Sequence, residues 1–278
     1  MKPFLKWVGG KARVIAQLEQ LFPESFNNYF EPFVGGGAVY FDTNAKTATI
    51  NDINKSLIGS YINVRDNVDL LINKLNSLQK QYYKLDEDQQ KEMFYRIRNE
   101  YNNAKNYSSV KKSSLLIFLN KTCFNGMYRE NKSGGFNVPF GKHRKPTICD
   151  ETNLRAVSEQ LKNTIILSGS YKKAVENAKA GDFIYFDPPY HPLNSTSSFT
   201  SYSQDDFIEK DQVELKELID DLTARGCKVM MSNSYSKFII NLYKDYKQYK
   251  IAVGRSINSN GAKRGKIAEI VVTNYYKT

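Results

Sequence analysis

Short apolar and aromatic runs separated by polar segments occur towards both ends of the chain. The runs NYFEPF, TATIND, NTIILSGS, DFIYFD, CKVMMSNS and IAEIVVTNY are rich in β-branched and aromatic residues, which predicts strands. Helical spacing of apolar residues predicts helices near Lys210 to Arg225 and Ser236 to Tyr246. This alternation of strands and helices is typical of an α/β sheet.

The middle of the chain has a different pattern. From Ser56 to Tyr107, Leu, Ile and Tyr recur at helical spacing, as in DLLINKLNSLQKQYYKL, and predict helices. Between Lys111 and Thr147 a short apolar run precedes TCFNGMYRENKSGGFNVPFGKHRKPT, whose Ser-Gly-Gly predicts a hairpin tip among basic and aromatic residues. We therefore expect one α/β domain built from residues 1–55 and 163–278, with a mostly helical, basic module of residues 56–162 inserted into it.

Composition and charge narrow the class of protein. The 278 residues are 41% hydrophobic and 25% charged, which is ordinary globular composition. The longest apolar run, LLIF, is far too short for a membrane span, and the N-terminal sequence lacks a signal-peptide core, so we expect a cytoplasmic protein without membrane partners. The 40 basic against 29 acidic residues give a net charge of +11, which favours nucleic acid as partner, although many soluble proteins are simply basic.

Few residues are available for metal or Ser-His chemistry. Cys123, Cys149 and Cys227 are widely spaced, so they predict neither a disulfide framework nor a Cys-x-x-Cys zinc site. His143 and His191 are the two histidines. We therefore expect no metal, and look for the chemistry among carboxylates, amides and aromatic residues.

Two glycine-containing stretches stand at predicted turns. Glu31–Gly37 follows the first strand, where glycines let the backbone approach a ligand. It is not a dinucleotide-binding G-x-G-x-x-G, because Tyr40 occupies the third glycine position. The other stretch, KWVGGKAR, is not a P-loop, because Leu5 and Ala12 stand where Gly and Ser/Thr are required. A plain strand-to-helix turn would also need glycine in the first stretch.

Asp52 ends the next predicted strand, about 15 residues after the glycine turn. This sequence spacing is close to the one at which an acid binds the ribose hydroxyls in nucleoside-binding α/β folds. An aspartate at a strand end also serves as a turn or helix cap. The glycine turn and the spaced acid together favour a nucleoside ligand without phosphates.

The third unusual strand end is Asp187-Pro188-Pro189-Tyr190. Proline ends strand pairing, so the stretch is a competent strand terminator, but that interpretation leaves the tyrosine unexplained. A nucleobase amine is a poor nucleophile unless acceptors hold both its N–H bonds. The Asp187 carboxylate and the Pro188 carbonyl supply two such acceptors, and proline adds no competing N–H. Tyr190 could stack on a base that has left the duplex.

DPPY, FVGGG, the N-terminal KWVGGK and the order of these motifs resemble the DNA adenine-N6 methyltransferases of the Dam type. The resemblance covers nearly the whole chain, including the tail RSINSNG. It implies a Rossmann-like methyltransferase sheet, mixed but largely parallel, and an inserted DNA-recognition domain with a β-hairpin. It also implies that Asp187, Pro188, Pro189 and Tyr190 are the catalytic residues that hold a flipped adenine.

By this resemblance the methyl donor is S-adenosylmethionine. Trp7, Lys11 and the turn Phe33–Gly37 would hold its methionine portion, and Asp52 its ribose hydroxyls. Many relatives carry an acid where this chain has Gly169-Ser170-Tyr171, so Ser170 and backbone groups would recognise the cofactor adenine. The implied cofactor-binding residues are Trp7, Gly10, Lys11, Glu31, Pro32, Phe33, Gly35, Gly37, Asp52, Ile53, Ser170, Tyr171 and Asp187.

The stretch FNGMYR matches the family's basic hairpin. Phe124 would wedge into the base stack, Asn125 would fill the gap, and Arg129 would pair with a guanine. Met127 and Pro139 would contact the thymine methyl. The implied DNA-binding residues are Lys6, Asn120, Lys121, Phe124, Asn125, Met127, Arg129, Pro139, His143, Asn258, Asn260, Lys263 and Arg264.

Lys6 would reach the outer guanine, and the whole pattern resembles the one used for GATC. The expected partner is double-stranded DNA, and the expected state in solution is a monomer. The sequence leaves open whether the enzyme acts alone or in a restriction-modification system.

Four alternatives remain. A different recognition sequence is compatible with the motifs. Methylation of cytosine N4 is typical of Ser-Pro-Pro-Tyr rather than Asp187-Pro-Pro-Tyr, and RNA methylation would leave the hairpin without a role. A DNA-binding protein that has lost catalysis would be expected to carry damage in DPPY or in the glycine turn, and both motifs are intact.

Overall fold

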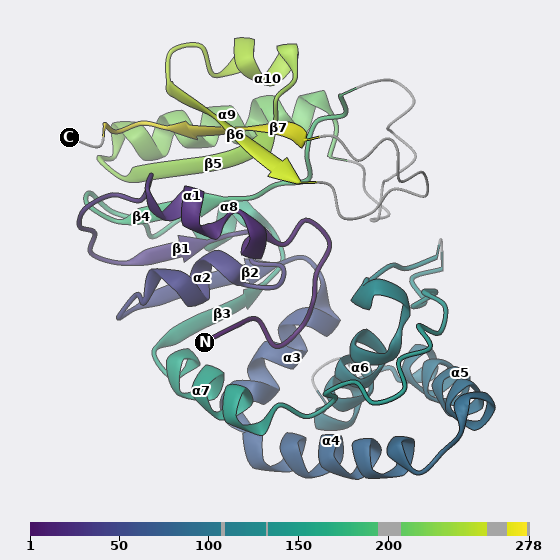
Figure 1. Cartoon of the computed structure of the whole chain (residues 1–278). Coiled ribbons are helices and arrows are strands. Elements are labelled where there is room, and N and C mark those ends of the chain that lie inside the picture. The colour runs from purple at the N-terminus through teal and green to yellow at the C-terminus, as the bar shows by residue number, and fades with distance from the viewer. Residues whose placement is uncertain (107–108, 132, 194–206, 255–265, 277–278) are drawn as a thin grey trace. The chain divides into compact units, whose positions relative to one another are not determined.

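The computed structural model describes residues 1–106, 109–131, 133–193, 207–254 and 266–276. Within them, one seven-stranded sheet has the order β3-β2-β1-β4-β5-β7-β6 (Figure 1). β1 pairs in parallel with β2 and β4, and β4 with β5, whereas β7 is antiparallel to β5 and β6. The strands are β1 (Tyr29–Glu31), β2 (Ala48–Asp52), β3 (Thr164–Ser168), β4 (Phe183–Phe186), β5 (Lys228–Ser234), β6 (Lys247–Gly254) and β7 (Lys266–Thr273). The predicted α/β class with a mixed, largely parallel sheet is confirmed.

Helices and two short 3-10 turns connect these strands. They are η1 (Lys11–Arg13), α1 (Ile15–Glu19), α2 (Ala38–Thr43), α3 (Lys55–Asp66), α4 (Val68–Tyr83), α5 (Glu87–Asn103), α6 (Val110–Thr122), η2 (Phe124–Gly126), α7 (Glu151–Leu161), α8 (Tyr171–Ala174), α9 (Glu209–Ala224) and α10 (Lys237–Leu242). In the part of the chain that the structure describes, none of these helices combines the length and apolar character needed to cross a membrane.

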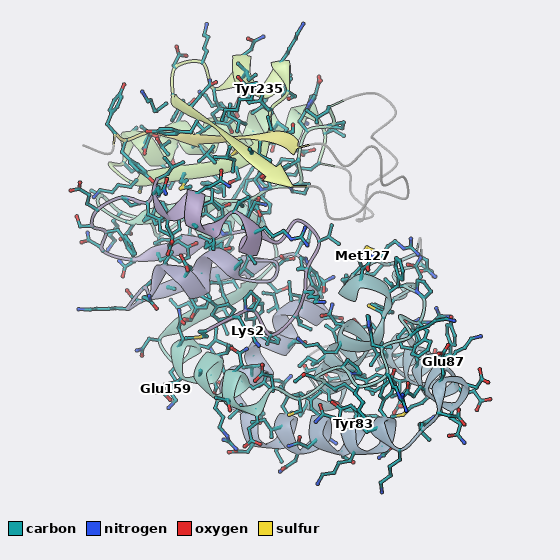
Figure 2. The ribbon with its side chains drawn as sticks, in the orientation of Figure 1. Lys2, Tyr83, Glu87, Met127, Glu159 and Tyr235 are labelled. Atoms are coloured by element: carbon teal, nitrogen blue, oxygen red, sulfur yellow. The ribbon has the colours of Figure 1, made fainter. Side chains whose placement is uncertain are left out.

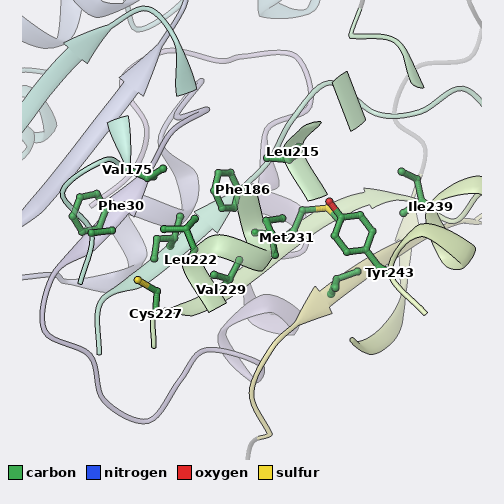
Figure 3. Packing of buried hydrophobic residues seen from close by; sticks show 14 of the residues in the cluster. Phe30, Val175, Phe186, Leu215, Leu222, Cys227, Val229, Met231, Ile239 and Tyr243 are labelled. Atoms are coloured by element: carbon green, nitrogen blue, oxygen red, sulfur yellow. The ribbon is translucent and has the colours of Figure 1, made fainter. Parts of the chain in front are cut away.

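Strand β4 lies at the centre of the sheet and leads into the DPPY segment. All four of its residues are fully buried, which explains its uninterrupted run of aromatic and apolar residues. Leu215 and Leu222 of α9 belong to the same buried cluster as Phe186 of β4 and Met231 of β5 (Figure 3). This packing fixes the carboxyl end of β4, after which Asp187 follows directly.

Strand β6 was not predicted from the sequence. It is an edge strand that begins with Lys-Gln-Tyr-Lys, and such polar residues protect a sheet edge while weakening the apolar pattern. The helix expected from Ser236 to Tyr246 is correspondingly shorter, because α10 ends at Leu242 and a turn leads into β6.

The chain divides into two compact units. The first comprises Met1–Gly10, Val34–Asn44 and Asn51–Gly169, and the second comprises Lys11–Phe33, Ala45–Ile50 and Ser170–Thr278. The first unit contains the whole segment 56–162. The division of roles between that segment and residues 1–55 and 163–278 stays a prediction.

Helix α6 forms the centre of the helical part of the first unit. It packs against α3, α4 and α5, and ten of its 13 residues are buried. The sequence showed only the short apolar run LLIF here, because a helix buried on all sides lacks the polar face that reveals helical periodicity. The helices expected between Ser56 and Tyr107 are confirmed as α3, α4 and α5.

Candidate functional site

The glycine turn after β1 depends on glycine for both conformation and space. Gly35 and Gly37 have φ values of 48° and 73°, in the left-handed region that favours glycine. A Cβ atom on Gly37 would stand 2.6 Å from the hydroxyl of Tyr61, so a side chain there would collide. The Gly35 N–H donates to Oδ2 of Asp52 over 3.1 Å. The turn and the acid that follows β2 are therefore joined directly.

Asp52 is held at both oxygens by backbone donors. Oδ1 accepts from the N–H of Asn54 over 2.9 Å while Oδ2 accepts from Gly35. Burial raises the pKa of Asp52, and these backbone hydrogen bonds oppose the rise. Each carboxylate oxygen has a second lone pair, so Asp52 can still accept from a ligand hydroxyl. The neighbouring Ile53 is 69% exposed, which leaves an apolar surface beside the acid.

Trp7 lies against this glycine turn. A Cβ atom on Gly35 would be 3.0 Å from Trp7 Cδ1, and the N–H of Gly10 donates to the Trp7 carbonyl over 3.2 Å. The Trp7 indole stacks on the ring of Tyr128, with 4.5 Å between ring centroids and 19° between planes. Tyr128, which the sequence did not single out, thus fixes one face of Trp7.

Asn120 serves the N-terminal segment rather than the surface. Its side chain is 1% exposed, accepts from the N–H of Lys6, and donates to the carbonyls of Lys6 and Gly126 over 2.9 and 3.0 Å. Asn120 therefore holds the backbone of the exposed Lys6 against the turn η2, and the DNA contact expected of its side chain stays a prediction.

The predicted hairpin occupies residues 123–131 and 133–140 of the described chain. Antiparallel bridges join Cys123 with Phe140 and Glu130 with Phe136, and Gly134 at the tip has φ 78°. We call these residues the recognition hairpin. Its tip lies where the Ser-Gly-Gly sequence predicted it.

The residues expected to contact bases differ in exposure. Phe124 is 49% exposed, Asn125 is exposed with φ 57°, and Pro139 is exposed. Met127, which is labelled in Figure 2, is half-buried. The Phe124 N–H donates to the Pro139 carbonyl over 2.9 Å, which ties the two ends of the hairpin together.

Arg129 is oriented by a residue of the opposite arm. Its Nε donates to Asn137 Oδ1 over 2.7 Å, and one Nη donates to the Asn137 carbonyl over 3.3 Å. The guanidinium plane is thereby fixed along one edge. Asn137 was not singled out from the sequence, because its role depends on cross-strand pairing.

Two lysines act on the charge of a third, Lys121, in the first unit. Burial, together with the charges of Lys6 and Lys2, lowers the pKa of Lys121 to about 8. Lys2, labelled in Figure 2, forms an ion pair with Asp150 over 3.0 Å. His143 is exposed. A concentration of positive charge of this kind suits phosphate groups.

In the second unit, Lys11 and Asp187 form an ion pair. Lys11 Nζ lies 2.7 Å from Asp187 Oδ2, and the two side chains are 6% and 18% exposed. Burial raises the pKa of Asp187, and Lys11 counteracts the rise. The buried Asp187 Oδ1 has no hydrogen-bond partner within the described residues. One oxygen is thus neutralised by lysine, and the other is an unsatisfied acceptor.

Tyr190 closes the same cluster. Its hydroxyl donates to Oε2 of Glu269 on β7 over 2.9 Å, and Lys11 Nζ lies 4.9 Å from its ring centroid. Burial raises the pKa of Glu269, and the charge of Asp187 raises it as well, so this acid belongs to the electrostatic environment of Asp187. Glu269 was missed from the sequence because it lies 79 positions from Tyr190 and carries no local motif.

The other predicted cofactor residues of the second unit form an aromatic and polar group. Phe33 stacks on Tyr171 at 5.1 Å, and Ser170 Oγ accepts from the N–H of Lys172 as a helix cap. Glu31 is buried and accepts from the Tyr29 hydroxyl over 2.6 Å. Pro32 is also buried. The predicted contacts Asn258, Asn260, Lys263 and Arg264 lie outside the described residues.

Residues 7–257 match the family model described as D12 class N6 adenine-specific DNA methyltransferase. The chain is 45% identical to the type II methyltransferase M.MjaIII of Methanocaldococcus jannaschii, with 99% of each sequence covered. It is 40% identical to M1.LlaDCHI of Lactococcus lactis, over 99% of this chain and 96% of that protein. It is also 32% identical to the DNA adenine methylase of Escherichia coli K12, over 97% and 94%.

Proposed function

Because the chain belongs to the D12 class of N6 adenine-specific DNA methyltransferases, we propose that it methylates the adenine of GATC in duplex DNA, held by Asp187 and Pro188. The enzyme acts on DNA adenine as its family does. The GATC sequence, the flipped base and the roles of individual residues are the proposal. The observation that carries it is the buried, unsatisfied Oδ1 of Asp187 beside a carboxylate oxygen already paired with Lys11.

An adenine amine has two hydrogens to donate, and this segment offers acceptors for both. Asp187 Oδ1 accepts one hydrogen. The Pro188 carbonyl accepts the other, since that of Pro189 already accepts from Gln212 Nε2 over 2.9 Å. With both N–H bonds engaged, the nitrogen lone pair turns out of the base plane and becomes nucleophilic. Catalysis then comes from positioning and electrostatics rather than from a strong base.

The ring of Tyr190 stacks on the face of the flipped adenine. A base must leave the duplex for its amine to be reached by an enzyme, and an aromatic ring recovers part of the lost stacking energy. Glu269 fixes the tyrosine hydroxyl, so the ring presents a fixed face.

The residues of the glycine turn fit S-adenosylmethionine, which supplies a methyl group on a sulfonium when bound. Asp52 accepts the ribose hydroxyls with its remaining lone pairs, and the exposed Ile53 gives the cofactor adenine an apolar surface. Trp7 and the glycines Gly35 and Gly37 accept the methionine portion, since a side chain on either glycine would fill the space beside Trp7 or Tyr61.

The recognition hairpin reads the DNA. Phe124 is exposed enough to wedge between bases, and Asn125 lies beside it to occupy the gap left by a flipped base. Arg129 pairs with a guanine, because its guanidinium is already held in one plane by Asn137. Lys6 and Lys121 supply positive charge for the phosphates and the outer base pair.

The proposed recognition of GATC is tested with labelled S-adenosylmethionine and a set of DNA duplexes that differ only at the GATC positions. We expect label in the GATC duplex and at least about 100-fold less label when any one of its base pairs is exchanged, since each mismatched pair costs about 1 to 3 kcal/mol and the catalytic geometry is lost as well. Equal labelling of a GATC-free duplex would contradict the assigned site while leaving adenine methylation intact.

A further inference from the structure

Both peptide groups that flank Tyr190 are held by two buried side-chain amides. Gln212 on α9 donates from Nε2 to the Pro189 carbonyl over 2.9 Å. Asn233 on β5 accepts at Oδ1 from the His191 N–H over 3.0 Å. The two amides bind each other, because Asn233 Nδ2 donates to Gln212 Oε1 over 3.0 Å. They thus form a closed chain of hydrogen bonds around the backbone of Tyr190.

The direction of this chain is fixed by its backbone partners. Asn233 Oδ1 accepts from two backbone N–H groups, those of His191 and Ser234, and such groups can only donate. The NH2 group of Asn233 must therefore face Gln212, which in turn must aim its own NH2 group at the Pro189 carbonyl. Neither amide can be reversed without leaving donors opposed to donors.

Neither amide is explained by the packing around it. Gln212 and Asn233 are both 0% exposed, and α9 and β5 otherwise contribute apolar residues such as Leu215 and Met231 to the core. A buried amide costs free energy unless every donor and acceptor is satisfied. Here the hydrogen bonds of the pair join the two amides to each other, to the two peptide groups beside Tyr190, and to the N–H of Ser234.

The same segment is held at two further points. Ser234 Oγ donates to the His191 carbonyl over 2.6 Å, and Glu269 accepts from the Tyr190 hydroxyl over 2.9 Å. Tyr190 is thus fixed at both adjoining peptide planes and at the far end of its ring.

From this arrangement we propose that Gln212 and Asn233 are a positioning pair that sets the height and tilt of Tyr190 over the target adenine, and that leaves Pro188 rather than Pro189 as the free carbonyl acceptor. The inference rests on the proposed function of the DPPY segment and deepens it. The pair touches no reacting atom. It acts by reducing the freedom of the residues that do.

The test replaces Gln212 by methionine, which keeps the length of the side chain but removes both hydrogen bonds. We expect kcat at saturating DNA and cofactor to fall about tenfold to a hundredfold, as a displacement of about 1 Å in a catalytic group does. KM for DNA and the dissociation constant for S-adenosylmethionine should stay within about twofold, because neither the recognition hairpin nor the glycine turn is altered.

The matched control is Gln248→Met. Gln248 also donates through Nε2 to backbone carbonyls of the second unit, those of Ile240 and Tyr243, but has no contact with the DPPY segment. It reports the general effect of losing such an amide. A loss of kcat in Gln212→Met no larger than that in Gln248→Met, with a similar fall in melting temperature, would overturn the proposal and leave a structural role.

A second variant serves if Gln212→Met does not fold, as judged by circular dichroism. Gln212→Glu keeps size and polarity but sets a carboxylate oxygen against the Pro189 carbonyl, and should lower kcat in the same way. Asn233→Leu loses the donor to Gln212. Because the two amides act through one chain, the loss in the double variant Gln212→Glu with Asn233→Leu, which sets no two carboxylates against each other, should be smaller than the product of the two single losses.

A spectroscopic measurement separates the inference from the function on which it rests. In a duplex with 2-aminopurine at the target position, fluorescence should rise on binding wild-type enzyme, as the base leaves the stack. With Gln212→Met the fluorescence should rise but with a longer lifetime, because the base is no longer held against the tyrosine. If wild-type enzyme gives neither methyladenine nor a rise, the proposed function fails. If wild-type enzyme gives both and the variant matches Gln248→Met, the inference alone fails.

Discussion

For a single residue, Asp187, two opposing effects set the pKa of the side chain. Burial disfavours its ionised form and raises its pKa, while the Lys11 ammonium 2.7 Å away favours ionisation. Only the ionised carboxylate can accept an amine hydrogen at Oδ1 without offering a competing proton. Activity should therefore be lost as the pH falls through the pKa of Asp187, and that pKa lies above the ordinary value for an aspartate.

Lys11→Met should shift the acidic limb of the pH–activity profile, where activity is lost as Asp187 becomes protonated. Removal of the neighbouring positive charge raises the pKa of Asp187 further, so the pH at which kcat falls to half should rise by about one unit or more. The measurement is the pH profile of kcat at saturating S-adenosylmethionine, which removes any contribution from weaker cofactor binding. Lys11→Arg keeps the charge and should leave the limb near that of the wild type. An unmoved limb in Lys11→Met would show that Asp187 does not limit the rate at low pH.

At the scale of the element, the recognition hairpin presents Arg129 in a fixed plane. One edge of its guanidinium is occupied by Asn137, through hydrogen bonds from Nε and one Nη. A planar fork of this kind matches the acceptors of a guanine. We therefore propose that the hairpin contributes to sequence specificity through the orientation of Arg129 as well as through its charge.

Arg129→Ala should weaken discrimination at one base pair by about 1 to 3 kcal/mol, and Asn137→Leu should weaken discrimination at the same pair by less. The measurement is kcat/KM on duplexes with a single exchanged base pair. Asn102→Leu is the control, because Asn102 binds the backbone of Phe136 in the same hairpin without touching Arg129. If all mismatches were affected equally, Arg129 would be a phosphate contact instead.

Some of the segments and site residues could be predicted from the sequence, and others could not. The DPPY segment, the glycine turn and Asp52 were predictable, because each lies at the end of a strand with a distinct apolar pattern. The edge strand β6 and the buried helix α6 were not, since one is too polar and the other is buried on all sides and has no polar face to reveal its periodicity. Glu269, Gln212, Asn233 and Asn137 were missed because their roles arise from pairing between distant segments, which no local motif records.

In the whole molecule, the net charge of +11 includes a group of neighbouring lysines in the first unit, Lys2, Lys6 and Lys121. Lys121 is the informative member, since its pKa is lowered to about 8 by burial and by Lys6 and Lys2. A lysine side chain is positively charged below its pKa and becomes neutral as the pH rises above that value. DNA phosphates favour the charged form, so DNA affinity should depend on this titration.

The dissociation constant for duplex DNA should therefore rise between about pH 7 and pH 9 as Lys121 loses its charge. Fluorescence anisotropy at constant ionic strength measures the effect. Lys121→Arg keeps its charge over this range and should flatten the curve. The same pH dependence in wild type and in Lys121→Arg would exclude Lys121 as a phosphate contact.

The most direct test of the central claim is the rate at which N6-methyladenine forms in a single turnover, measured by mass spectrometry of the nucleosides, with wild-type enzyme and with Asp187→Asn. Asparagine keeps the shape but turns one acceptor into a donor. We expect the rate to fall by on the order of 1,000-fold while DNA and cofactor binding change little. Asp182→Asn, at the opposite end of β4, is the control and should keep most of the rate. Methylation by Asp187→Asn at the wild-type rate would contradict the account.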